Sequence, residues 1–187
     1  MRDAVRFLFE IGQLKRVARS GWWVAGVRDP ESVAEHSFRC AWIGYLLAQR
    51  DGRADAGRVT LMCLMNDLHE ARINDLHKVA QAYVDFPAAE TRAFLDQAAT
   101  IPEGEALQQL HLEYQAGETH DAQLARDADR LEAAFQALEY MAEGYRATER
   151  WLESARVALR TEIAREMFAA MVDFDPTTWF HDLPRVP

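Results

Sequence analysis

Long helical patterns of apolar residues constrain the fold of this chain more than any other feature of its sequence. In residues 2–17, Val5, Leu8 and Phe9 fall on one side of a helix with a 3.6-residue period, and similar patterns recur along the chain. Alternating patterns that would indicate strands are scarce. We therefore predict an all-α fold, a compact helical bundle. The helices are expected at 2–17, about 32–50, about 55–73, about 76 to before Pro87, 88–99, 103–116, 119–143 and 148–172.

Capping signals and breakers set the expected limits of these helices. Ser32 followed by Glu35 has the spacing of a capping box, which predicts that a helix begins just after Ser32. Asn74 tolerates the left-handed conformation, so the third helix is expected to stop there. The segment 18–32 is expected to be a loop, and the end of the chain an irregular tail. The breakers are Gly21, Gly26 and Pro30 in the loop, and Pro176, Pro184 and Pro187 in the tail.

The size and charge of the chain limit its function. With 187 residues it is long enough to bury a core, and we predict a single domain at 1–187. A net charge of −9 argues against binding to a nucleic-acid polymer, which requires a broad basic face. A small anionic ligand remains compatible with this charge if a local cluster of Arg and Lys receives it.

The two cysteines and the hydropathy of the sequence indicate the cellular compartment that suits this chain. Cys40 and Cys63 both lie inside apolar helical patterns, and the simplest interpretation is two buried, reduced thiols in a cytoplasmic protein. The apolar runs are short and interrupted by charge. We therefore expect no signal peptide and no membrane span.

The segment 61–79 begins as a buried helical stripe and then fills with polar groups. The apolar residues are followed at once by Asn66 and Asp67, and Glu70 and Asp75 come next. Burying such groups without partners costs about 1–3 kcal/mol each, and more if they stay charged. A binding site in which they find a partner would offset that cost.

Polar positions on three separate predicted helices suggest that this partner is a metal ion. His36 lies one turn into the second helix, and Asp129 lies among apolar neighbours in 119–143. Asn66 and Asp67 lie in the third helix. Each residue alone would be unremarkable, since a single His or Asp is often a hydrogen-bonded structural residue. Together they form the convergent set that a divalent cation requires, and its charge would offset theirs.

Four stretches of the sequence occur in a recognisable order over about residues 7–140. They read LKRVARSGWW, DPESVAEHSFR, NDLHEARINDLHKVAQAY and RDADRLEAAFQALEY. In these stretches the chain resembles the HD-domain phosphohydrolases, which carry a His, then a His-Asp pair, then a distant Asp. It looks most like their 5′-deoxynucleotidase branch. The resemblance implies an HD-domain helical bundle with the metal and nucleotide site within about 15–140, followed by a C-terminal helix and tail at 148–187.

The resemblance also implies roles in metal binding and catalysis. By position, His36, Asp67 and Asp129 match the metal ligands of the family. The implied cofactor is one divalent ion of the Mn, Co, Mg or Zn class. Glu70 matches the catalytic Glu, and Asp75 matches the acidic residue that follows it.

Two further residues match substrate-binding positions of the family, and a third is a candidate to bind the substrate. Arg19 matches the arginine that receives the substrate phosphate, and its planar fork suits two phosphate oxygens. Trp22 matches the aromatic residue near it, although the adjacent Trp23 leaves the register open. An aromatic surface there could exclude a 2′-hydroxyl group. Lys78 could add positive charge to the pocket, or it could be a solvated charge at a helix start.

Asn66 departs from the family pattern, because it stands where the family has a metal-binding His. Its neutral amide oxygen can bind a hard cation but is a poor ligand for softer metals. We therefore expect weaker metal binding, shifted from Zn, Co or Ni towards Mg, Mn or Ca, with His69 as a conceivable substitute ligand. Two interpretations stay open: a working site with an altered metal preference, or a metal-impaired one.

The residues and the resemblance together predict a phosphomonoesterase that removes the 5′-phosphate from deoxyribonucleoside 5′-monophosphates. Three alternatives stay open: a nucleoside triphosphate hydrolase of the same superfamily, a catalytically silent nucleotide-binding protein, and a helical dimerisation protein with a vestigial pocket. The resemblance further implies a homodimer. The remaining histidines show no ligand spacing and are expected to be surface or hydrogen-bonded residues; they are His77, His111, His120 and His181.

Overall fold

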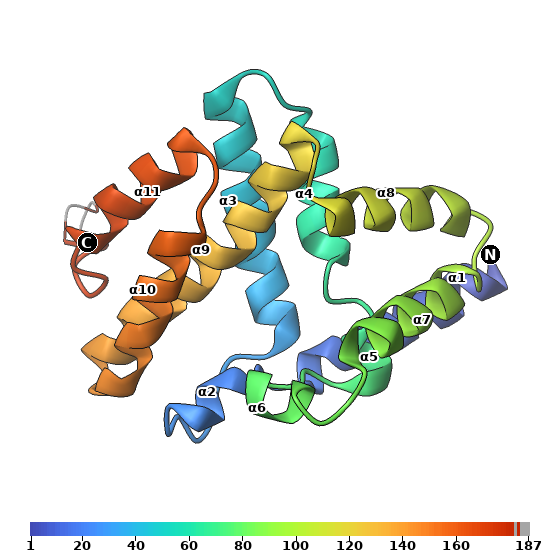
Figure 1. Ribbon diagram of the computed structural model, residues 1–187, viewed down its shortest axis with the longest axis horizontal. Helices are drawn as coiled ribbons and strands as arrows, with labels where there is room; N and C mark the ends of the chain where they lie inside the picture. Colours follow the sequence, from blue (N-terminus) through green and yellow to red (C-terminus); the bar gives the residue numbers. More distant parts are fainter. Residues whose placement is uncertain (182, 184–187) are drawn as a thin grey trace.

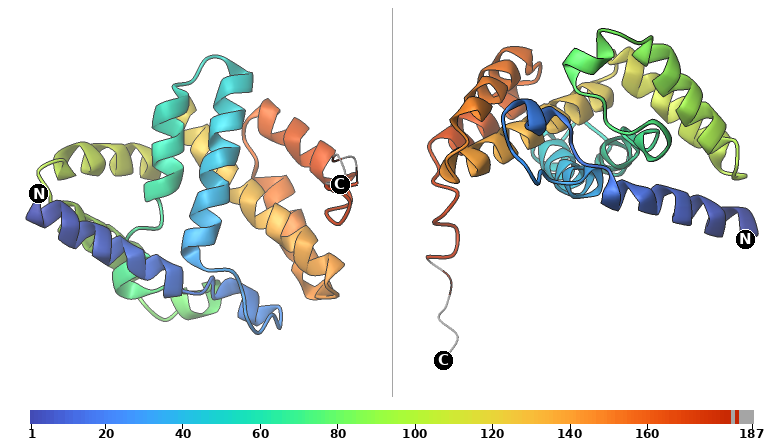
Figure 2. Two further views of the ribbon diagram at one scale, coloured as in Figure 1. Left: turned by 180° about the vertical axis from the view of Figure 1, so that it is seen from behind. Right: turned by 90° about the horizontal axis from the view of Figure 1, so that it is seen from below.

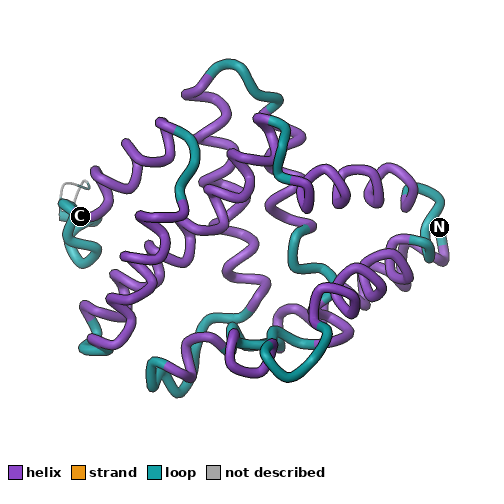
Figure 3. The backbone as a smooth tube through the Cα atoms, viewed as in Figure 1, coloured by secondary structure: helices purple, strands orange, loops and turns teal. Residues whose placement is uncertain are grey.

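The structure is a computed structural model that describes residues 1–181 and residue 183. Its helices are α1 (Arg2–Ile11), η1 (Gly12–Arg16), α2 (Gly21–Val24), α3 (Val33–Asp51), α4 (Ala56–Met65), α5 (Glu70–Ile73), α6 (Lys78–Gln81), α7 (Phe86–Ala98), α8 (Gly104–Ala116), α9 (His120–Ala142), η2 (Arg146–Thr148), α10 (Glu149–Ala158) and α11 (Glu162–Val172). Figure 1 and Figure 3 show this helical architecture, in which the described chain forms no strand. The all-α prediction is confirmed. None of the described helices is both long and apolar enough to span a lipid bilayer.

Helices α3, α4 and α9 pack against one another at the centre of the molecule. Their facing sides carry fully buried residues such as Leu47 of α3, Met62 of α4 and Leu131 of α9, each of which stabilises the fold by about 1.5–3 kcal/mol. Gly44 allows α3 to approach α4 closely, because a Cβ at this position would lie 2.6 Å from Cys63 Sγ. In Figures 1 and 2, α10 and α11 flank this centre on one side, and α1, α7 and α8 lie on the other.

The predicted capping box opens α3. The Ser32 hydroxyl accepts a hydrogen bond from the Glu35 N–H at 3.2 Å, and the Glu35 carboxylate accepts one from the Ser32 N–H at 2.6 Å. These bonds satisfy two backbone donors that the first helical turn leaves free. Gly52 ends the helix in the left-handed conformation, with φ at 72°. The capping box therefore sets His36 one turn inside α3, where its side chain is buried.

The helix expected over 55–73 is interrupted. Helix α4 ends at Met65, tight turns follow, and α5 begins at Glu70. The Glu70 N–H donates to the Asp67 carbonyl oxygen at 3.0 Å, a three-residue spacing that differs from the four-residue spacing of an α-helix. The polar run therefore leaves the regular helix, and its side chains are presented from a turn. Helix α5 stops before Asn74, as predicted, but the left-handed helical conformation expected there is wrong: φ is positive at 61°, whereas ψ is 165°.

Two helices replace the single one expected over 148–172. The Asp127 carboxylate of α9 accepts hydrogen bonds from the N–H groups of Arg160 at 3.0 Å and Thr161 at 2.7 Å. Asp127 is fully buried, so its charge is matched by these donors. A carboxylate from another helix thus caps the start of α11 and separates it from α10.

Other predicted limits differ in smaller ways. The helix expected at 2–17 is divided into α1 and the 3₁₀ helix η1, and the loop expected at 18–32 contains the short helix α2. Between 76 and Pro87 the chain forms only the one-turn helix α6, and α7 begins at Phe86, one residue before this proline. Pro184 and Pro187 of the expected tail lie outside the described residues.

Candidate active site

Helix α3, helix α9 and the turn after α4 bring the three predicted metal ligands together. His36 Nε2 lies 3.0 Å from Asp129 Oδ1 and 3.4 Å from Asp67 Oδ2. Although burial and Arg19 disfavour a charged ring, Glu132 and Asp129 hold the pKa of His36 well above its ordinary value. The imidazole of His36 therefore occupies the point at which the two aspartates converge.

Glu132 orients His36 from the other side of the ring. Its fully buried carboxylate contacts His36 Nδ1 and accepts a hydrogen bond from Arg39 Nε at 2.9 Å. Arg39 also pairs with Glu139 on the next turns of α9. A carboxylate on the far nitrogen fixes the orientation and tautomer of a histidine, and this arrangement supports histidine ligands in metal sites. Nε2 is thereby directed towards the two aspartates.

The loop before α2 places Arg19 beside the same carboxylates. Arg19 Nη1 lies 3.6 Å from Asp67 Oδ2 and 4.0 Å from Asp75 Oδ2. The Asp75 carboxylate also accepts a hydrogen bond from the Ser20 N–H at 2.9 Å, which ties the loop after α5 to the loop before α2. A backbone hydrogen bond from the Arg19 N–H to the Glu31 carbonyl oxygen, at 2.9 Å, holds the other side of the loop. The guanidinium group is therefore fixed in the acidic cluster.

Glu70 carries an unused carboxylate oxygen in this site. The residue is 5% exposed, and its buried Oε2 has no hydrogen-bond partner among the described residues. Burial and the neighbouring Asp67 raise the pKa of Glu70 well above its ordinary value. Burial also raises the pKa of Asp75. Burial and the neighbouring carboxylates therefore favour the protonated form of Glu70.

Asn66 and His69 lie at the edge of the cluster. Asn66 Nδ2 donates a hydrogen bond to Asp67 Oδ1 at 2.9 Å, so its amide nitrogen faces the carboxylate. His69 Nδ1 lies 3.1 Å from the Asn66 carbonyl oxygen, and the ring packs against Phe86. Within the described part of the chain, no set of three or more possible ligands with neighbouring donor atoms includes His69. The same holds for Asp67, and His69 Nε2 is buried without a hydrogen-bond partner among the described residues, so His69 stays an alternative ligand.

A pocket of about 580 Å³ lies over the cluster, and every predicted site residue except His36 lines it. Trp22 lines this pocket but is only 2% exposed, because it packs between Tyr140 and Trp151. Lys78 is exposed at the pocket wall, where its Nζ donates to Gln81 Oε1 at 3.0 Å. The structure thus places Trp22 as a rigid wall of the pocket and Lys78 at its mouth.

Helix α10 contributes lining residues that the sequence analysis missed. Arg150, Trp151 and Ser154 border the pocket from α10, which packs against α9. The Trp151 ring centroid lies 4.9 Å from that of Trp22. These residues lie outside the four recognised stretches, so motif matching could not find them. The sequence did offer one signal that α10 could line a site: an amphipathic helical pattern with an aromatic residue near its start.

The residues present fit a divalent cation. Four carboxyl groups lie close enough to act on the guanidinium group of Arg19, and a bound cation would favour their charged forms. Among the described residues, two sets of three possible ligands have their donor atoms within 4.8 Å of one another; both include His36, and neither includes Asp67. The buried Oε2 of Glu70 is an acceptor that a cation or its water would satisfy. The four carboxylates are those of Asp67, Glu70, Asp75 and Asp129.

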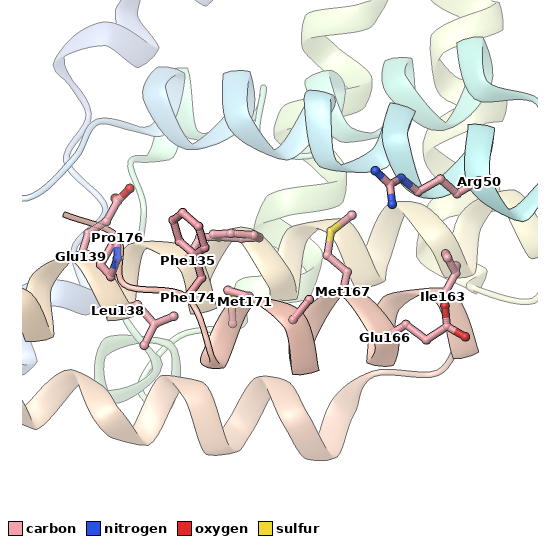
Figure 4. A pocket seen from close by; sticks show the side chains of 11 residues that line it. Arg50, Phe135, Leu138, Glu139, Ile163, Glu166, Met167, Met171, Phe174 and Pro176 are labelled. Carbon is pink, nitrogen blue, oxygen red and sulfur yellow. The ribbon is translucent and has the colours of Figure 1, made fainter. Parts of the chain in front are cut away.

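A second, apolar groove lies away from this cluster, between α3, α9 and α11 (Figure 4). It has a volume of about 350 Å³, and its apolar lining includes Phe135, Leu138 and Met167. Its charged lining residues include Arg50 of α3 and Glu166 of α11. None of the predicted site residues lines it. The apolar groove therefore takes no part in the predicted site, whose residues lie at the first pocket.

Comparison with known proteins agrees with this geometry. A family model described as an HD domain matches residues 11–171. The chain belongs to the HD domain family. It is 31% identical to 5′-deoxynucleotidase HDDC2 of Mus musculus over 139 residues, which are 73% of this chain and 69% of the mouse protein.

Solved structures of similar proteins share the fold of this HD domain. A conserved hypothetical protein from Pyrococcus furiosus is 32% identical, with a TM-score of 0.79 over 91% of this chain and 99% of the other. A predicted metal-dependent phosphohydrolase from Magnetospirillum magnetotacticum is 25% identical, with a TM-score of 0.72 over 92% of this chain and 90% of the other. The resemblance to HD-domain proteins that the four sequence stretches carry is therefore confirmed.

Proposed function

We propose that this HD-domain chain is a metal-dependent phosphomonoesterase that removes the 5′-phosphate from deoxyribonucleoside 5′-monophosphates. The observation that carries the proposal is the convergence of His36, Asp67 and Asp129 beside Arg19 and Glu70. The mouse relative is named a 5′-deoxynucleotidase, which supports the same chemistry. The family model's match along most of the chain supports a single domain.

His36, Asp67 and Asp129 would hold the cation, with Asn66 as a weak additional ligand. Family membership and the phosphohydrolase relative support one divalent ion of the Mn, Co, Mg or Zn class. Such an ion, when bound, polarises a phosphoryl oxygen and lowers the pKa of its water. To act as a ligand, His36 gives up the proton at Nε2, while the contact with Glu132 keeps the proton at Nδ1.

Arg19 would bind the substrate phosphate. Its guanidinium group lines the pocket between Asp67 and Asp75, and its planar fork can donate to two phosphate oxygens at once. Asp75 and the Ser20 N–H hold the loop that carries this arginine. Two fixed hydrogen bonds to phosphate would orient the ester bond towards the acidic cluster.

Glu70 would manage the proton of the reaction. Its buried Oε2 has no other partner among the described residues, and its raised pKa favours the protonated form. From Oε2 it would deliver that proton to the leaving 5′-oxygen; in its carboxylate form it would instead orient the attacking water. Asp75, whose pKa is also raised, would be the second acid of the site.

The aromatic wall and the exposed lysine would meet the nucleoside. Trp22, held by Trp151 and by a hydrogen bond from its Nε1 to Glu31 at 3.0 Å, offers a rigid apolar surface. Such a surface disfavours a 2′-hydroxyl group, which would lose its hydrogen bonds to water there. Lys78 at the pocket mouth would add positive charge for the anionic substrate.

A cytoplasmic homodimer is part of the proposal, with no membrane or nucleic-acid polymer as partner. Helix α3 exposes Phe38, Trp42 and Tyr45, which are 65%, 52% and 40% exposed. Residues at this spacing share a helix face, and exposed apolar faces are typical of protein interfaces. Cys40 and Cys63 are free and buried, which suits a reducing compartment. Light scattering should give the mass of two chains; the mass of one chain at all concentrations would contradict the dimer.

Phosphate release tests the proposed reaction. Deoxyribo- and ribonucleoside 5′-monophosphates are offered to the chain and to Asn66→His with Mg, Mn, Co or Zn, and bound metal is quantified. Release by the unsubstituted chain supports the proposal, and release only by Asn66→His marks a metal-impaired form of the same enzyme. Nucleotide binding without release by either protein would favour the silent binding protein. Release of triphosphate from nucleoside triphosphates would favour the triphosphate hydrolase.

A further inference from the structure

Cys40 belongs to the same cluster as two of the proposed metal ligands. The donor atoms of His36, Cys40 and Asp129 all lie within 4.8 Å of one another. Cys40 follows His36 by four residues on α3, so the two side chains share one face of the helix. Both residues are 1% exposed. The thiol is therefore presented to the acidic cluster from the protein interior.

Cys63 shows what an ordinary core thiol looks like in this molecule. Both cysteines are free and buried. Cys63 Sγ donates to the Ala125 carbonyl oxygen at 3.8 Å and packs where α3 approaches α4 at Gly44. Among the described residues, no set of possible ligands with neighbouring donor atoms includes Cys63. Cys40 lies next to Cys63 but differs from it, because a histidine and a carboxylate also lie beside Cys40. Cys63 and burial raise the pKa of the Cys40 thiol well above its ordinary value, and a bound cation would favour the thiolate.

Asn66 leaves the proposed cation with few strong ligands. Its amide is neutral, and its Nδ2 faces the Asp67 carboxylate. Without a histidine at this position, the strong ligands are one imidazole and two carboxylates. A thiolate would complete a set of four, the number that tetrahedral sites for Zn²⁺ require.

We propose that Cys40 is a ligand of the divalent cation in this chain and compensates for the histidine that Asn66 replaces. This inference rests on the proposed metal-dependent function. Binding converts the thiol to a thiolate, and the thiol proton passes to the solvent. The resulting nitrogen, sulfur and oxygen donors favour Zn or Co over Mg or Ca. This preference is the opposite of the one that Asn66 alone predicts.

The geometry leaves only a small rearrangement for such a site. With Zn–S and Zn–N bonds of about 2.3 and 2.1 Å, two ligands of a tetrahedral ion lie about 3.6 Å apart. The donor atoms of His36, Cys40 and Asp129 already lie within 4.8 Å of one another, whereas Asp67 contacts His36 Nε2 at 3.4 Å but is not part of that set and would have to move towards Cys40. Glu132, which contacts His36 Nδ1, keeps the ring oriented during this closure.

Co²⁺ binding tests this inference through a signal that is independent of activity. The chain, Cys40→Ser, Cys40→Ala and the matched control Cys63→Ser are titrated with Co²⁺, and near-ultraviolet thiolate-to-cobalt charge transfer is recorded. Circular dichroism and the melting temperature establish that each variant is folded. We expect the band in the chain and in Cys63→Ser, and no band in either Cys40 variant. Zn²⁺ affinity should fall about tenfold or more in Cys40→Ser and stay unchanged in Cys63→Ser.

Two outcomes would overturn the inference. One is bound Co²⁺ without the charge-transfer band in the unsubstituted chain, and the other is a band that survives in both Cys40 variants. Phosphate release with Co²⁺ in either case would leave the nucleotidase proposal standing without Cys40 as a ligand. Failure of the chain to bind any of the divalent metals would instead contradict the proposed function itself.

Discussion

Arg39 binds two glutamates of α9, and only Glu132 also touches His36. Glu132 is fully buried and contacts His36 Nδ1, whereas the Glu139 side chain is 41% exposed and pairs with Arg39 at the surface. Both glutamates therefore pair with Arg39, but only a change at Glu132 also removes a contact with the His36 ring. They provide a matched pair for testing how the metal site is held.

We predict that Glu132→Gln lowers the affinity for divalent metal about 10–100-fold, because an amide holds the His36 tautomer less firmly than a carboxylate. Glu139→Gln should leave the affinity unchanged, since Glu139 meets Arg39 and lies at the surface. Isothermal titration calorimetry with Mn²⁺ measures both variants. Equal losses in the two variants would show that Glu132 acts through Arg39 rather than through His36.

His111 is a buried histidine with a depressed pKa, and the expectation of a surface or hydrogen-bonded residue is wrong for it. Its ring is 0% exposed and stacks on Phe94 with centroids 3.9 Å apart. Neither ring nitrogen has a hydrogen-bond partner in the described chain. Burial, with a smaller contribution from His69, lowers the pKa of His111 to about 4.

This pKa predicts an acid sensitivity of stability. In the unfolded chain a histidine binds its proton at about pH 6.5, whereas His111 in the folded chain binds it at about pH 4. The free energy of unfolding should therefore fall by up to about 3 kcal/mol as pH drops from 6.5 to 4. His111→Leu should remove this part of the slope, and exposed His181→Gln should retain it. Urea unfolding over this pH range would contradict the prediction if His111→Leu and the unsubstituted chain lose stability in parallel.

Several site residues could be predicted from the sequence, because the order and spacing of the motifs place them on helices that meet in the fold. His36, Asp67 and Asp129 do meet, as the motif order implied. Trp151 was missed because only the packing of α10 against α9 brings it to the pocket. Cys40 has the four-residue spacing from His36 that could have indicated its place in the cluster.

At the scale of elements, the break between α10 and α11 shows what sequence patterns cannot report. The helical pattern continues across 148–172, yet Asp127 captures the N–H groups at the start of α11 from another helix. Such a cap depends on tertiary packing and leaves no local signal. The box at Ser32 and Glu35 was predictable because both partners lie three residues apart. The turn after Met65 was missed because apolar periodicity does not show where polar residues leave a helix.

Asp127→Ala should destabilise the protein by about 3 kcal/mol, because buried N–H groups would lose their acceptor. Asp55 caps α4 by accepting from the Gly57 and Arg58 N–H groups, but at the surface. The control Asp55→Ala should therefore cost only about 1 kcal/mol. Chemical denaturation compares the two variants, and equal losses would argue against Asp127 as the element that separates α10 from α11.

At the scale of the whole molecule, the pocket joins segments that are far apart in the sequence. The loop before α2, the loops around α5, and helices α9 and α10 all line it. A cation bound there would connect these segments in the folded state only. Metal binding should therefore raise the stability of the entire chain, not of one helix.

We predict that a saturating divalent metal raises the melting temperature. At a concentration of 100 times its dissociation constant, a metal that binds only the folded state adds about 2.7 kcal/mol. Asp129→Asn should abolish this shift, because it removes a charged ligand next to His36. Asp96→Asn, an exposed aspartate on α7 outside the pocket, should keep the full shift. Scanning fluorimetry with Mn²⁺ and Zn²⁺ measures it, and a shift that survives in Asp129→Asn would place the metal elsewhere.

The central claim is that this cluster hydrolyses a phosphate monoester with Glu70 as its proton carrier. The most direct test is inorganic phosphate released from a deoxyribonucleoside 5′-monophosphate by the metal-loaded chain and by Glu70→Gln. We predict release by the unsubstituted chain and a rate about 10²–10⁴-fold lower for Glu70→Gln, with nucleotide binding retained. Equal rates in the two proteins, or no release by the metal-loaded chain, would contradict the account.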